Sequence, residues 1–144
     1  DTVLAGESLV AFDVDDLIVG VATCYDIRFP EQFKELASQG AQLIVVPTSW
    51  ADGPGKLEQW RLLTAARALD STSYILAAGQ SRPGGDAEAG NPSGPTGIGH
   101  STIVDPNGVR MAEAGYEDDI LYADIYPNEV AKTRRALPVV ATAD

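Results

Sequence analysis

The chain has 144 residues, of which 44% are hydrophobic, enough for one domain with a buried core. It carries 21 acidic and 10 basic side chains, and the net charge of −11 argues against a nucleic-acid groove, which needs basic residues. Its apolar stretches are far too short to cross a bilayer. A single cysteine excludes an internal disulfide, as is typical of a reducing compartment, and no secretory leader is recognisable, so we expect a cytoplasmic protein.

The first part of the chain predicts strands that alternate with a helix. Residues 8–14 alternate in polarity and predict a strand. A turn joins them to residues 17–24, an apolar run typical of a strand that is buried on both faces. Residues 30–39 predict a helix with a proline in its first turn, and residues 42–46 predict another buried strand.

A helix and a long loop dominate the middle of the chain. Residues 56–71 predict a helix whose apolar stripe is too broad for one partner layer, so we expect part of it to form an interface with a second copy. Residues 73–79 predict a strand. Residues 81–97 are rich in glycine and proline and too long and polar for a tight connection, so they predict a mobile surface loop.

The last part of the chain predicts a hairpin, a strand and a helix. Residues 98–104 and 109–114 predict two strands, and the sequence Asp-Pro-Asn-Gly between them is a strong turn signal. Residues 120–125 predict a final strand, and residues 127–136 predict a short helix. The alternation of strands and helices along the whole chain indicates an α/β fold.

Cys24 lies at the carboxyl end of a predicted strand, where open α/β sheets usually place their active sites. It ends the apolar run 17–24 and precedes a polar, turn-forming stretch, which places its thiol at the carboxyl end of a buried strand. A free thiol has a pKa of about 8.5, so a catalytic thiol needs a base to remove its proton and N–H donors for an oxyanion. The backbone N–H of Tyr25 is a candidate oxyanion donor. Position alone also fits a buried structural cysteine.

Three residues beyond the next strand are candidates for the walls of a pocket. Thr48, Ser49 and Trp50 follow a strand that we expect to run parallel to that of Cys24, so they should emerge at the same edge of the sheet. For Trp50 the pattern fits either a pocket wall or core packing.

Charged residues near these segments predict structural support. Arg28 and Glu31 are three residues apart around a helix start, so we expect them to pair with each other or with neighbouring loops and to hold the Cys24 turn rigid. Direct contact with a substrate is the alternative. Arg67 lies on the apolar helix and is expected to form a buried structural ion pair.

The sequence predicts no cofactor and no metal site. His100, the only histidine, is the one candidate for a Cys–His pair within the chain, but no motif supplies an orienting partner, and a structural hydrogen bond is favoured. One cysteine and one histidine do not make a four-ligand zinc site. The glycines of residues 79–99 do not form a phosphate-binding fingerprint.

Several segments resemble the nitrilase superfamily, the carbon–nitrogen hydrolases, in the order in which that family carries them. The segment Gly-Val-Ala-Thr-Cys-Tyr-Asp-Ile-Arg-Phe-Pro-Glu around Cys24 closely resembles the nucleophile segment of the family. Weaker resemblances follow over residues 40–50, Trp60, residues 66–70, residues 74–78 and residues 99–108. The resemblance implies the C-terminal half of an αββα sandwich, with Cys24 as the nucleophile and helical layers that pair in a homodimer.

The resemblance also implies groups that the chain lacks. Family members add to the cysteine a Glu general base, a Lys and a second Glu, all of which would precede Asp1 here. The lysines of the chain all follow the cysteine: Lys34, Lys56 and Lys132. We therefore interpret residues 1–144 as a partial carbon–nitrogen hydrolase domain and expect the isolated chain to be inactive.

Within the superfamily, residues 26–31 and 95–101 most resemble the amidase branch that acts on small ω-amides and deaminated glutathione. The resemblance implies that the Cys24 thiolate attacks an amide carbon, that ammonia leaves an acyl-enzyme, and that water then releases the acid. A nitrile or carbamoyl hydrolase, an acyltransferase with the same nucleophile and a non-catalytic dimerisation module are the alternatives. The expected partners are a small amide and a second copy of the chain, with no nucleic acid and no membrane.

Overall fold

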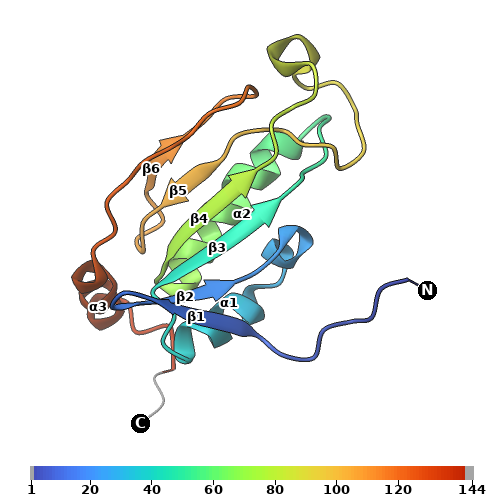
Figure 1. Cartoon of the computed structure of the whole chain (residues 1–144). Helices are drawn as coiled ribbons and strands as arrows, with labels where there is room; N and C mark the ends of the chain where they lie inside the picture. The colour runs from blue at the N-terminus through green and yellow to red at the C-terminus, as the bar shows by residue number, and fades with distance from the viewer. Residues whose placement is uncertain (1, 142–144) are drawn as a thin grey trace.

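One mixed sheet organises the computed structural model, which describes residues 2–141 (Figure 1). Within these residues its six strands are β1 (Val10–Val14), β2 (Leu17–Val21), β3 (Leu43–Thr48), β4 (Tyr74–Gly79), β5 (Thr102–Val104) and β6 (Arg110–Glu113). They lie across the sheet in chain order. β2, β3 and β4 are parallel, whereas β1, β5 and β6 pair antiparallel with their neighbours.

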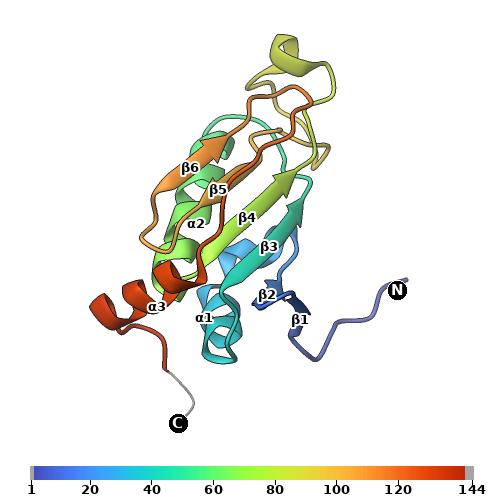
Figure 2. The same ribbon diagram turned by 60° about the vertical axis from the view of Figure 1, so that its left-hand side comes forward.

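The helices in the described part of the chain are α1 (Pro30–Ser38), α2 (Lys56–Ser71), α3 (Pro127–Ala136) and the short 3-10 helices η1 (Cys24–Arg28) and η2 (Gly85–Glu88). Figure 1 looks onto the sheet with α1 and α2 behind it. In Figure 2 the loop that carries η2 projects past the arrowheads of β3 and β4, and α3 lies at the opposite end of the sheet. Within residues 2–141 no helix has the length and apolarity needed to span a bilayer.

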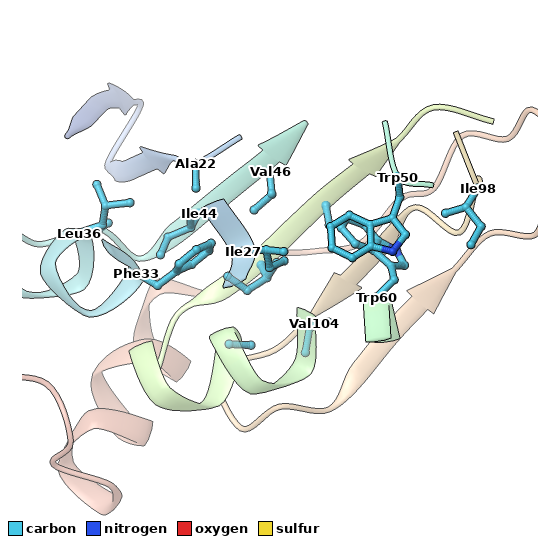
Figure 3. Close-up of a cluster of buried hydrophobic side chains, with 14 residues drawn as sticks. Ala22, Ile27, Phe33, Leu36, Ile44, Val46, Trp50, Trp60, Ile98 and Val104 are labelled. Atoms are coloured by element: carbon cyan, nitrogen blue, oxygen red, sulfur yellow. The ribbon is translucent and has the colours of Figure 1, made fainter. Parts of the chain in front are cut away.

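The main core fills the space between the sheet and the two longer helices. Ile44 of β3 lies in register with Ile75 of β4, and both are fully buried. Phe33 and Leu36 from α1 and Trp60 from α2 pack against this face (Figure 3). This cluster holds α1 and α2 on the sheet and thereby fixes the loops at its carboxyl edge.

The other face of the sheet carries a second, smaller cluster because side chains alternate along a strand. Val19, Leu43 and Tyr74 are in register across β2, β3 and β4, one residue before the positions that face α1 and α2. They pack with Val130 of α3. α3 therefore covers only one end of this face.

The α/β fold is confirmed, and the predicted helices are found within a residue of their expected ends. α2 spans the predicted residues 56–71, and α1 ends at Ser38. The loop 81–97 includes η2 and is hydrogen-bonded to the loop that follows β3, as detailed below; its mobility remains a prediction.

Two predicted strands are shorter in the structure because the backbone turns left-handed. β2 ends at Val21 and not at Cys24, because Cys24 has a φ of 50° and opens η1. β5 begins at Thr102 and not at residue 98, because Gly99 and His100 have φ values of 63° and 55°. An extended strand cannot contain such residues.

The predicted strand over residues 120–125 is wrong. The segment has the expected alternation, with Ile120 and Tyr122 exposed and Leu121 and Ala123 half-buried. However, it pairs with no strand among the described residues. Residues 119–121 instead pass over β4 and β5, where they line a shallow apolar hollow. A strand needs hydrogen-bonding neighbours, and a segment crossing a sheet face has none in that sheet.

Candidate functional site

Cys24 lies at the first residue of η1, three residues beyond the end of β2. Its φ of 50° lies in the left-handed region, which is uncommon for a residue other than glycine and costs about 1–3 kcal/mol. The turn is held by side chains. The backbone N–H of Thr23 donates to Asp26 Oδ2 at 2.9 Å, and Gln32 Nε2 donates to the same oxygen at 3.3 Å. Local hydrogen bonds therefore stabilise a strained backbone at the thiol.

The thiol faces the loop that follows the neighbouring parallel strand. Cys24 Sγ lies 3.8 Å from Ser49 O, to which it donates a weak hydrogen bond. Around the thiol is an open pocket of about 130 Å³. It is lined by Cys24, Tyr25, Arg28, Ser49, Trp50, Ala51, Lys56 and Pro95. The structure thus brings Ser49 and Trp50 beside Cys24 because β2 and β3 are parallel neighbours.

Trp50 is both a wall of this pocket and a core residue. Its side chain is buried, packs against Trp60 with ring centroids 5.3 Å apart and the rings tilted by 44° (Figure 3), and donates from Nε1 to Lys56 O at 3.1 Å. The Arg28 guanidinium lies 4.8 Å from the Trp50 ring centroid and 5.4 Å from that of Tyr25. Trp50 therefore both lines the pocket and packs in the core, which were the two alternatives left open by the sequence.

The remaining supporting residues are more scattered. Arg28 donates to Gln59 Oε1 at 3.1 Å, which ties η1 to α2 and turns the guanidinium toward α2. Glu31 is exposed on the first turn of α1, outside the residues that line the thiol pocket. Thr48 is buried at the end of β3, where its hydroxyl donates to Val46 O. The structure does not bring Glu31 or Thr48 to the thiol.

The first turn of η1 offers backbone N–H groups as hydrogen-bond donors next to Cys24. The leading N–H groups of a helix have no intrahelical acceptor, and those next to Cys24 include that of Tyr25. The Tyr25 side chain is 64% exposed at the mouth of the pocket. The Tyr25 backbone N–H donates to no acceptor among residues 2–141, so it is a candidate donor next to the thiol, and the Tyr25 ring lies at the rim of the pocket.

Arg67 supports the η1 turn and forms the expected ion pair, which is only partly buried because the Asp70 side chain is 32% exposed. Its Nε donates to Ile27 O at 2.7 Å, and its Nη1 lies 2.8 Å from Asp70 Oδ2. Burial raises the pKa of Asp70 above its ordinary value, although the charge of Arg67 acts in the opposite direction. The ion pair thus serves to position η1, because Ile27 is part of that turn.

His100 lies outside the thiol pocket. Its Nδ1 is 2.8 Å from Ile98 O, its ring meets Tyr116 edge-on at 4.4 Å, and its carbonyl accepts a hydrogen bond from Trp60 Nε1 at 2.9 Å. It lines a separate hollow with Gln80 and Asp118. A structural role is therefore confirmed, and no Cys–His pair forms. No cluster of three or more potential metal-ligating side chains occurs within residues 2–141.

Three residues that line the pocket were not predicted from the sequence: Ala51, Lys56 and Pro95. Lys56 begins α2, so its place directly after the loop of Ser49 and Trp50 was a usable signal. Pro95 comes from the distant loop 81–97 and reaches the pocket through a hydrogen bond from Ser49 Oγ to its carbonyl, 2.7 Å long. No local pattern in the sequence indicates that contact.

Comparison with known proteins shows the family. A family model described as carbon–nitrogen hydrolase matches residues 2–135. The chain is 42% identical over 128 residues to the deaminated glutathione amidase of Escherichia coli O157:H7, and the match covers 89% of this chain and 44% of that protein. The chain belongs to the carbon–nitrogen hydrolase family, whose amidases are among its relatives, and it spans about half the length of the curated relatives that it matches.

Solved structures agree with this assignment. Saccharomyces cerevisiae Nit3, a member of branch 10 of the nitrilase superfamily, matches with a TM-score of 0.79 at 33% identity, over 97% of this chain and 49% of that chain. A mutant amidase from Nesterenkonia sp. AN1 matches with a TM-score of 0.70 at 27% identity, over 93% of this chain and 47% of that chain. That amidase carries the acetamide moiety of fluoroacetamide covalently on its active-site cysteine.

Proposed function

We propose that this chain supplies the nucleophile of an amidase that hydrolyses small linear amides. The observation that carries the proposal is the Cys24 thiol, half-buried at the head of η1 in a pocket beside a free backbone N–H. Two relatives support it: one is named as an amidase, and the other is an amidase with a substrate-like group bound to its cysteine.

The proposed reaction has two steps. Cys24 Sγ forms a bond to the amide carbon, the carbon–nitrogen bond breaks, and the nitrogen leaves as ammonia after it accepts a proton. Water then attacks the thioester carbon, the sulfur–carbon bond breaks, and a carboxylic acid is released. In this proposal the Tyr25 N–H stabilises the oxyanion in both steps. The Glu base, the Lys and the second Glu implied by the family resemblance would come from the part of the relatives that this chain does not cover.

The charge around the thiol favours amides that also carry a carboxylate. The chain has a net charge of −11, yet both charged residues that line the pocket, Arg28 and Lys56, are cations. Arg28 is committed to Gln59 and to the aromatic rings, which leaves Lys56 as the freer charge. Succinamate and glutaramate are substrates of this kind.

The proposed function is tested by measuring ammonia release from succinamate, glutaramate and a neutral amide of matched length. The measurement uses the intact protein, by which we mean the complete domain of which we interpret residues 1–144 as a part. We expect turnover of the amides, with preference for the two acids. If none of the amides is hydrolysed while nitriles or carbamoyl compounds are, the amidase assignment is wrong.

Replacing Lys56 by Gln should raise the KM for succinamate about tenfold, because a charge-assisted hydrogen bond contributes on the order of 1.5 kcal/mol. The KM for the neutral amide should not change. Lys34→Gln is the matched control, because Lys34 is exposed on α1 and does not line the pocket. Equal KM changes for the charged and neutral amides in Lys56→Gln would exclude a carboxylate contact.

We also propose that two copies associate through α2. Leu62 and Leu69 are seven residues apart on one face of the helix and remain 69% and 44% exposed. Leu62→Glu should shift the protein toward monomer in sedimentation, whereas Val139→Glu, at an exposed apolar site outside α2 (45% exposed), should not. A wild-type protein that sediments as a monomer at micromolar concentration contradicts this interface.

A further inference from the structure

Two loops are joined along one side of the thiol pocket. Residues 49–53 follow β3, and residues 90–97 form the last part of the long loop after β4. Backbone and side-chain hydrogen bonds join them: Ser49 Oγ to Pro95 O (2.7 Å), Gly97 N to Trp50 O (3.0 Å), Ser93 N to Asp52 O (3.2 Å) and Asp52 N to Ser93 Oγ (3.1 Å). Because both loops line the pocket, we call residues 49–53 and 90–97 the pocket wall.

A buried ion pair joins Asp52 of this wall to Arg82, which lies earlier in the long loop after β4. Asp52 and Arg82 are only 3% and 8% exposed, and Arg82 Nε lies 3.3 Å from Asp52 Oδ2. The carboxylate also accepts hydrogen bonds from Gly53 N at 2.7 Å and from Gly90 N at 2.9 Å. Removing two charges from water is costly unless hydrogen bonds compensate for it, and here the carboxylate gathers its donors from both loops.

The ion pair belongs to the wall and not to the core. Asp52 and Arg82 both lie in loops, outside every helix and strand. Arg82 also donates to Asn91 O at 3.4 Å, which again joins it to the second loop. The core beneath is apolar and is built by Trp60, Ile44 and their neighbours without either charge. The charges are therefore placed where they fix the two loops against each other.

The connection from the pair to the thiol is short. Asp52 is two residues from Trp50 and three from Ser49, whose carbonyl accepts the weak hydrogen bond of Cys24 Sγ at 3.8 Å. Gly97 permits the close packing of the two ends of the long loop after β4: its φ is 118°, and an added Cβ would collide with the carbonyls of Ser81 and Gln80. A shift of the wall would therefore move Ser49, Trp50 and Pro95 together.

We infer that Asp52 and Arg82 are positioning residues, which set the pocket wall against the Cys24 thiol and thereby determine how well an amide is held there. Neither side chain lines the pocket, so both act through the wall. The effect on catalysis rests on the proposed amidase function, whereas the effect on the wall does not.

The kinetic test uses Asp52→Asn and Arg82→Gln in the intact protein. Either change should raise the KM for succinamate about tenfold and leave kcat within about threefold, because misplacing a wall weakens substrate positioning without removing a reacting group. The double variant should have a KM similar to that of the single variants, because each single change already breaks the Asp52–Arg82 ion pair. Glu113→Gln is the matched control, because it removes a carboxylate from an exposed ion pair with Arg61 that does not touch the wall.

A second test needs no turnover. The rate at which Cys24 reacts with an aromatic disulfide, dithiobis(nitrobenzoate), reports the access that the wall allows. Asp52→Asn should speed this reaction at least about threefold, because local opening of the wall becomes easier. Glu113→Gln should leave the rate unchanged. Failure of the amidase function would remove only the kinetic test, and this labelling test would still decide the role of the pair.

The outcomes separate positioning from general stability. A partly misfolded protein has fewer active sites, so its apparent kcat falls while its KM stays constant. A fall in kcat at constant KM, or a wild-type KM and labelling rate in Asp52→Asn, overturns the inference.

If Asp52→Asn does not fold, Ser93→Ala removes a hydrogen bond of the pocket wall without leaving a buried charge. It should then show a smaller rise in both KM and labelling rate, and wild-type values there would also overturn the inference.

Discussion

Replacing Cys24 by alanine is expected to lower the kcat of the intact protein for amides by about three to six orders of magnitude. Alanine offers no atom that can form the acyl-enzyme, so only substrate binding and the oxyanion donor remain. The fold should persist, because the thiol is half-buried and its one recorded hydrogen bond is the long contact to Ser49 O. Ammonia release measures the effect, and circular dichroism checks the fold.

Cys24→Ser is the companion variant. It restores the size of the side chain and a hydroxyl donor but not an easily ionised nucleophile, so it should be nearly as inactive as Cys24→Ala. Mass spectrometry of the wild-type protein mixed with substrate should show an adduct on the peptide that contains Cys24, and neither variant should show it. Turnover by Cys24→Ala at the wild-type rate would refute the nucleophile assignment.

Replacing Trp60 by alanine should produce the largest loss of stability, about 4 kcal/mol in the free energy of unfolding. The Trp60 ring is fully buried at the centre of the main core, it packs against the Trp50 ring, and its Nε1 donates to His100 O. Its removal leaves a cavity and an unsatisfied carbonyl at the same point. Urea unfolding gives the measurement.

Val109→Ala is the control for Trp60→Ala. Val109 lies outside α2, just before β6, and is 58% exposed, so its truncation should change the free energy of unfolding by less than about 0.5 kcal/mol. Trp60→Phe should fall between the two, since it keeps most of the ring and loses the donor. Equal effects at residues 60 and 109 would mean that Trp60 does not lie at the core of the fold.

The helices could be predicted from the sequence because their signals are local. α2 begins after Gly55 and ends before Thr72, and these two left-handed residues interrupt the helical pattern at each end. The segment 120–125 shows the limit of the same reasoning. Its alternation of polarity is real and reappears as alternating exposure, yet whether it is a strand depends on a neighbouring strand that its own residues do not specify.

Some residues of the candidate site could likewise be predicted from the sequence, and others could not. Cys24, Ser49 and Trp50 could be placed together because they follow two parallel strands of one sheet. Pro95 and Arg82 could not, since loops find their partners through tertiary contacts such as the one from Ser49 to Pro95, 46 residues apart. Glu31 was expected to help hold the Cys24 turn rigid, but the first turn of α1 leaves its side chain exposed to solvent.

At residue 24 the left-handed backbone conformation lowers the stability of the fold, whereas the cysteine side chain supplies the nucleophile of the proposed reaction. Glycine and asparagine adopt a φ near 50° at lower cost than cysteine does. A population of variants selected only for resistance to heat would therefore gain by losing the thiol, and only selection for a nucleophile would retain it. Efforts to make this protein more robust should consequently leave residue 24 untouched and look for gains in the exposed positions around the sheet.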